Sequence, residues 1–89
     1  MNNDTPTDPY VLALAALAAT LDDPRRARRF LDLTGIGTDE LRARADEPSL
    51  LVALIAFLEA HEPDLISVSE QVGIGPATLA AVRQQLENN

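Results

Sequence analysis

The residues with the greatest chemical potential are one histidine, a few serines and a run of arginines. His61 is the only histidine, and it lies among Glu59, Glu62 and Asp64, a combination that suggests a metal site. These residues straddle an expected helix end at spacings that do not converge on one point, and no second histidine or cysteine completes a tetrahedral site. We therefore expect no metal, and we place His61 in the last turn of a helix, where its charge suits the helix dipole.

Nucleophilic catalysis is also poorly served by this composition. Ser49, Ser67 and Ser69 have only His61 as a base, and the chain contains no lysine and no cysteine. Most carboxylates fall at expected helix starts, where capping accounts for them. The sequence thus predicts a non-enzymatic protein without catalytic residues and without a cofactor.

Arginine is concentrated in one segment. Six of the seven arginines lie between residues 24 and 44, which carry a net charge of +3, whereas the rest of the chain carries −10 and the whole chain −7. A candidate partner-docking face follows from the expected helix 24–34 and consists of Arg25, Arg26, Arg28 and Arg29. Because the planar arginine fork forms paired contacts with carboxylate or phosphate, this face suits an acidic partner, an RNA or a lipid head group.

Neutralisation within the molecule is the alternative interpretation of these arginines. Asp22 precedes Arg25 by three residues, and Arg29 precedes Asp32 by three, which are spacings at which charges meet on a helix surface. The acidic remainder of the chain supplies further carboxylates. The sequence favours this self-paired, solvated face over a docking face.

Proline, glycine and small polar residues mark six helix starts. Proline follows an acidic residue at positions 9, 24, 48 and 63, it follows Gly75 at position 76, and the hydroxyl of Thr38 is expected to cap the remaining helix. The expected helices span 9–21, 24–34, 38–45, 48–61, 63–72 and 76–87. No segment alternates as a strand does. The sequence therefore predicts an all-α, compact bundle of five to six short helices, with the apolar helix 48–61 at its centre.

The spacing of these marks is repeated along the chain. Pro9 and Pro24 are fifteen residues apart, as are Pro48 and Pro63, and each half continues to a Gly-Ile-Gly triplet, at 35–37 and at 73–75. We therefore expect two similar halves, 9–45 and 48–87, within one domain that covers 8–87. The preceding residues 1–7 form an expected disordered tail.

The triplets carry a first resemblance. A hydrophobic residue between two glycines, flanked by helices, resembles the helix-hairpin-helix motif, with segment 72–82 the better copy and 33–41 the poorer one. The resemblance implies a degenerate tandem nucleic-acid-binding domain, in which backbone amides near Gly73 and Gly75 hold a phosphate and Arg83 lies nearby.

Charge disfavours that nucleic-acid partner. Asp39 and Glu40 follow the first triplet, where the motif commonly has a basic residue, and the net charge of −7 repels phosphates. The alternative is that both triplets only end one helix and start the next.

The whole chain carries a second resemblance. The Ala/Leu-rich first helix, the segments 29–36 and 41–45, and the apolar helix ending in Phe57 and Leu58 resemble a set of short bacterial all-helical proteins classified as a domain of unknown function. This resemblance implies an all-helical fold and a bacterial cytoplasmic setting. It supplies no activity and no functional residues.

These observations favour a small protein-interaction or regulatory module. We expect a cytoplasmic location with a protein partner or self-association, for example through helix 9–21. The N-terminus lacks the positive charge of an export signal, and the longest apolar run is about half the roughly 20 residues that a membrane span requires, so we expect no membrane partner. Besides the helix-hairpin-helix alternative, an acidic surface that imitates nucleic acid is a third hypothesis.

Overall fold

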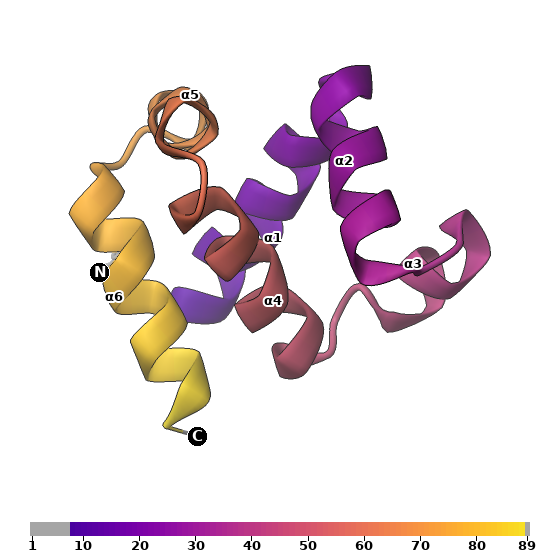
Figure 1. Cartoon of the computed structure of the whole chain (residues 1–89). Coiled ribbons are helices and arrows are strands. Elements are labelled where there is room, and N and C mark those ends of the chain that lie inside the picture. Colours follow the sequence, from indigo (N-terminus) through magenta and orange to yellow (C-terminus); the bar gives the residue numbers. More distant parts are fainter. Residues whose placement is uncertain (1–7, 89) are drawn as a thin grey trace.

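Six helices make up the part of the chain that the structure describes. The computed structural model describes residues 8–88, and its helices are α1 (Pro9–Leu21), α2 (Pro24–Thr34), α3 (Thr38–Arg44), α4 (Pro48–Glu59), α5 (Glu62–Val72) and α6 (Pro76–Glu87) (Figure 1). No strand occurs among these residues. The predicted all-α class is therefore confirmed, whereas the expected tail, residues 1–7, lies outside the described residues.

Helix starts follow the proline pattern with some corrections. The Asp8 and Asp23 carboxylates accept backbone N–H bonds at the starts of α1 and α2, as expected of capping residues. The prediction that Thr38 caps α3 is wrong, because Gly37 occupies the cap position, Thr38 is the first residue of the helix, and no side chain in residues 8–88 accepts a capping hydrogen bond there. The predicted end of helix 48–61 is also wrong, because α4 stops at Glu59.

The core is centred on α1 and α4 together. These two helices pack against each other, and both also pack against α5 and α6 (Figure 1). Half of the twelve residues in α4 are buried apolar residues, namely Leu50, Leu51, Leu54, Ile55, Phe57 and Leu58. In α1 the buried positions include Ala13, Ala16 and Leu17, so this helix belongs to the core. The prediction of a central helix is confirmed for α4, and α1 shares that place.

The two most apolar helices, α1 and α4, are shorter than a membrane-spanning helix. In residues 8–88 no single helix has the length and composition to cross a membrane. The helices α5 and α6 have them only when counted together, and this pair is bent by 92°.

The glycines of the two Gly-Ile-Gly triplets have similar backbone angles, whereas the hydrogen bonds that end the preceding helices differ, because Gly35 N–H donates to the Leu31 carbonyl and Ile36 N–H to the Thr34 hydroxyl. Gly35 and Gly73 end α2 and α5 in the left-handed region, with φ of 73° and 89°, which favours glycine at both positions. Gly73 and Ile74 donate to the carbonyls of Glu70 and Ser69, which is the Schellman pattern. In both places the triplet ends one helix and precedes the start of the next.

The two halves nevertheless differ in how their last helices pack. The seven-residue α3 buries only Leu41, whereas the twelve-residue α6 buries Leu79, Val82 and Leu86 against α4 and α1. The repeat therefore stays a prediction made from the sequence.

Tyr10 ties α1 to the connection between α3 and α4. Its hydroxyl donates to the backbone carbonyl of Asp46 at 2.6 Å. Desolvation of the partly buried ring, with a smaller contribution from the Asp46 carboxylate, raises the pKa of Tyr10 above its usual value of 10.0.

Replacement of Tyr10 by Phe tests this link through its pH dependence. With one tyrosine, no lysine and no cysteine, Tyr10 is the only side chain that titrates between about pH 9 and pH 11. Because its pKa is raised on folding, its contribution to stability is complete below the unfolded pKa and is lost as the pH rises through the folded pKa. We expect urea midpoints, followed by circular dichroism, to fall across this range for the wild type and to stay level for Tyr10→Phe. Parallel profiles would contradict the link.

Candidate functional site

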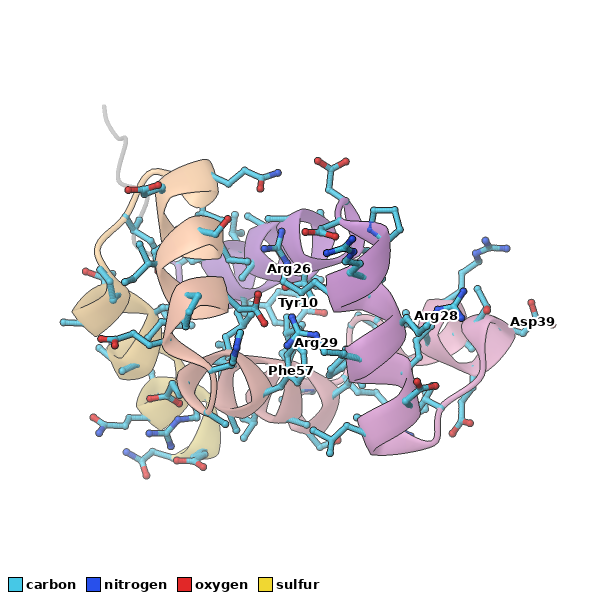
Figure 2. The ribbon with its side chains drawn as sticks, turned by 45° about the horizontal axis from the view of Figure 1, so that its top comes forward. Tyr10, Arg26, Arg28, Arg29, Asp39 and Phe57 are labelled. Atoms are coloured by element: carbon cyan, nitrogen blue, oxygen red, sulfur yellow. The ribbon has the colours of Figure 1, made fainter. Side chains whose placement is uncertain are left out.

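One of the four candidate docking arginines, Arg26, turns into the molecule, and a second, Arg29, reaches Asp64 while its side chain stays 45% exposed. Arg26 is only 5% exposed, and its guanidinium donates to the Ala19 carbonyl at 3.1 Å and to Ser67 Oγ at 3.4 Å. Figure 2 shows Arg26 and Arg29 between α2 and α5, with Phe57 below them. Arg26 is therefore buried and is not part of an exposed face, contrary to the sequence interpretation.

Asp64 of α5 is the carboxylate on which these arginines converge. It is 8% exposed, and Arg29 Nη2 donates to its Oδ2 at 2.5 Å, while Arg26 Nη1 lies 3.8 Å from its Oδ1. His61 Nδ1 lies 2.9 Å from the same Oδ2. The guanidinium of Arg29 also lies over the ring of Phe57, 5.7 Å from its centre. We call Arg26, Arg29, His61 and Asp64 the Asp64 cluster.

His61 occupies a different place from the predicted one. It is the residue before α5 and stands at the positive end of that helix, so the expected dipole contact in the last turn of α4 is wrong. Its bond to Asp64 takes the place of that contact. In residues 8–88, no group of three histidine, aspartate or glutamate side chains is arranged to hold a metal ion.

Arg25 and Arg28 face solvent. Both are exposed, and neither forms an ion pair with a carboxylate of residues 8–88. In Figure 2, Arg28 lies on the side of α2 that faces away from Arg26 and Arg29. With Pro24 and the stem of Arg29, these two arginines line a surface hollow of about 480 Å³.

Pairing within α2 does not account for the charge of this helix. The expected contact between Arg29 and Asp32 is absent from the described residues, because Arg29 binds Asp64 instead. Asp22 accepts a hydrogen bond from Gln71 at 3.3 Å rather than pairing with Arg25. The positive charge of α2 is therefore neutralised by Asp64 in the acidic second half of the chain, and only Arg26 and Arg29 are paired in this way.

A second hollow lies along the same helix and was missed by sequence reasoning. It measures about 370 Å³ and is lined by Arg29, Asp32, Leu33 and Phe57. Leu33 is 71% exposed, the most of any large apolar side chain in residues 8–88. The sequence places Leu33 inside the expected helix 24–34 and at the start of the poorer triplet segment 33–41, and neither assignment indicates that this side chain is exposed. We call Pro24, Arg25, Arg28, Asp32 and Leu33 the α2 outer face.

The candidate phosphate site has exposed glycines and an occupied arginine. Gly73 and Gly75 are both exposed. Arg83 pairs with Glu59 through its Nε and with Glu87 through Nη1 at 2.8 Å. The hydrogen bond to Glu59, followed by the charges of both glutamates, raises the pKa of Arg83 above its usual value. Arg83 thereby joins α6 to α4, and its charge is compensated.

Residues 8–88 thus form a small, six-helix, all-α fold with an ionic cluster around the buried Asp64. Comparison by sequence matches residues 6–89 to the family described as "Protein of unknown function (DUF3572)". The chain therefore belongs to the DUF3572 family, as the second sequence resemblance predicted. No curated protein and no solved structure shows a significant match.

Removal of the Asp64 charge tests the cluster. Asp64→Asn leaves the buried Arg26 without its counter-charge, so we expect a loss of about 3 kcal/mol in the free energy of unfolding. The matched control is Asp32→Asn, an exposed carboxylate of α2 for which we expect a change within about 0.5 kcal/mol. Urea denaturation measures both.

A double variant keeps this test interpretable if Asp64→Asn unfolds the protein. Replacing a buried ion pair by apolar residues is often close to neutral, so Arg26→Met combined with Asp64→Leu is expected to recover most of the loss. Equal stability of Asp64→Asn and Asp32→Asn would show that the cluster does not hold the fold.

Proposed function

We propose that this protein is a small, non-enzymatic protein-interaction or regulatory module of the bacterial cytoplasm that binds its partner through the α2 outer face. One observation carries the proposal: Arg25 and Arg28 remain without carboxylate partners in residues 8–88, although the chain has 14 acidic residues and only 7 basic ones. Exposed cations on a strongly acidic protein create a local reversal of surface potential, which steers acidic partners.

The contacts of the polar side chains support a non-enzymatic role. Asp64 and His61 contact each other, but the two arginines occupy the carboxylate, and no serine or threonine hydroxyl of residues 8–88 bonds to His61. Ser67 accepts a bond from Arg26, and Ser69 is buried. The contact between Asp64 and His61 is therefore explained by the ionic cluster that connects α2 to α5.

Affinity capture from the native cell tests the proposal with two charge-matched variants. Arg28→Glu reverses a charge on the α2 outer face, and Arg42→Glu reverses one on the exposed side of α3. Because an interface contact depends on position as well as on net charge, we expect a partner that the wild type and Arg42→Glu recover and that Arg28→Glu recovers at least about tenfold less. Mass spectrometry quantifies the recovery. Equal recovery by both variants would contradict a role for α2.

A degenerate helix-hairpin-helix domain is the second candidate function. It is favoured by the similar backbone angles of the glycines in the two triplets and by the exposure of Gly73 and Gly75. Two features oppose it: the ion pairs of Arg83 and the net charge of −7.

Fluorescence anisotropy with a labelled DNA duplex at about 20 mM salt separates the two candidates. The interaction-module proposal predicts no binding under these conditions, where phosphate attraction is strongest. The nucleic-acid alternative predicts binding that Gly75→Leu weakens and that Gly37→Leu, the matching position of the poorer copy, weakens less. Both positions have a φ near −80° and open space around an added side chain, so both variants are expected to fold.

A further inference from the structure

We infer that the α2 outer face binds an acidic segment of another protein that carries one large apolar side chain beyond its carboxylates. The inference rests on the proposed function and adds the chemistry of the partner. It starts from the two hollows along α2, one lined by Pro24, Arg25 and Arg28 and the other by Leu33 and Phe57, which have Arg29 in common.

The first hollow is suited to carboxylates. Arg25 and Arg28 are three residues apart and therefore project from neighbouring turns of the same side of α2. They stand at the N-terminal end of the helix, where the dipole also favours negative charge. Asp23 already accepts the backbone N–H groups of Arg25 and Arg26, at 3.0 and 3.4 Å. Recognition must therefore use the guanidinium groups, which can form paired bonds with carboxylates.

The second hollow is suited to an apolar group. Leu33 is largely exposed and Phe57 lines the floor, with Arg29 already placed over its ring. Asp32 also lines this hollow and has no ion-pair partner in residues 8–88, so it repels a carboxylate there. The order of the partner segment is thereby fixed, with its carboxylates toward Pro24 and its apolar side chain toward Leu33.

The distance between the hollows sets the spacing in the partner. Arg25 and Leu33 are eight residues apart on a helix, which is about 12 Å along its axis. A helical partner would span this distance in about eight residues, and an extended one in about four.

A second copy of the chain fits this pattern less well. The exposed stripe on α5, Glu62, Ile66 and Glu70, has an apolar residue between two carboxylates, so one glutamate would face Asp32. A nucleic acid fits less well for the same reason, since its phosphates continue past the arginines toward Asp32. An acidic segment with an apolar end avoids this repulsion.

Selection from displayed random peptides tests the inference. The probe is a library of peptides of about twelve residues, long enough for either spacing, panned on the immobilised full-length protein. We expect enriched peptides with at least two aspartates or glutamates followed or preceded by Leu, Phe, Met or Trp. Synthetic copies should bind about tenfold more weakly to Arg25→Gln/Arg28→Gln, which is the loss of two exposed charge pairs, and equally well to the control Arg42→Gln. Leu33→Ser should weaken binding without a change in charge.

Different failures have different meanings. Enriched peptides without an acidic excess that still lose binding to Leu33→Ser would overturn the inference and leave the proposed function intact. Peptides that bind all α2 variants equally would count against both. A mass that rises with concentration in light scattering for the wild type, and not for Arg25→Gln/Arg28→Gln, would place a second copy on this face and overturn the acidic-segment inference.

Discussion

A buried ion pair between Arg26 and Asp64 determines how α2 is attached to the rest of the fold. The helix fully buries only one apolar side chain, Phe30. Its ring packs edge-on against that of Phe57, with 5.4 Å between the two ring centres. With only Phe30 buried and Leu31 partly buried, apolar packing constrains the rotation of α2 weakly, whereas the Arg26 guanidinium donates to Ser67 and to the Ala19 carbonyl and lies 3.8 Å from Asp64. The buried Nε of Arg26 has no partner in residues 8–88, so desolvation offsets part of the gain. The pair therefore contributes more to the orientation of α2 than to its stability.

That orientation decides which arginines are available. With 3.6 residues per turn, Arg25 and Arg28 lie about 100° around the helix axis from Arg26 and Arg29, so they face solvent when Arg26 and Arg29 reach Asp64. The cluster needs only the inward pair to compensate its carboxylate, and the outward pair is left facing solvent. The Asp64 cluster and the α2 outer face thus lie on adjacent sides of one helix, and Arg29 belongs to the first while it lines both hollows of the second.

Local features of the structure could be predicted from the sequence, and long-range ones could not. Proline starts and left-handed glycines depend on the residues beside them, and the helix at Pro9–Leu21 has the predicted bounds for that reason. The partner of Arg29 is thirty-five residues away, so a search for charges at helical spacing found Asp32 instead. The position of His61 depended on α4 ending two residues early. The exposure of Leu33 follows from the rotation of α2, which only the packed structure reveals.

The Arg26–Asp64 pair also bears on the predicted repeat. Counting back nine residues from the first glycine of each triplet reaches Arg26 in one half and Asp64 in the other, and counting back five reaches Phe30 and Val68. All four side chains are buried. If the halves are equivalent, the same helical position meets its counterpart across the molecule, and two identical charges there would repel each other in a medium of low dielectric constant. Opposite charges at this one position allow both helices to bury it, whereas the repeat itself stays a prediction, because counted from Pro24 and Pro63 the residue that corresponds to Asp64 is Arg25.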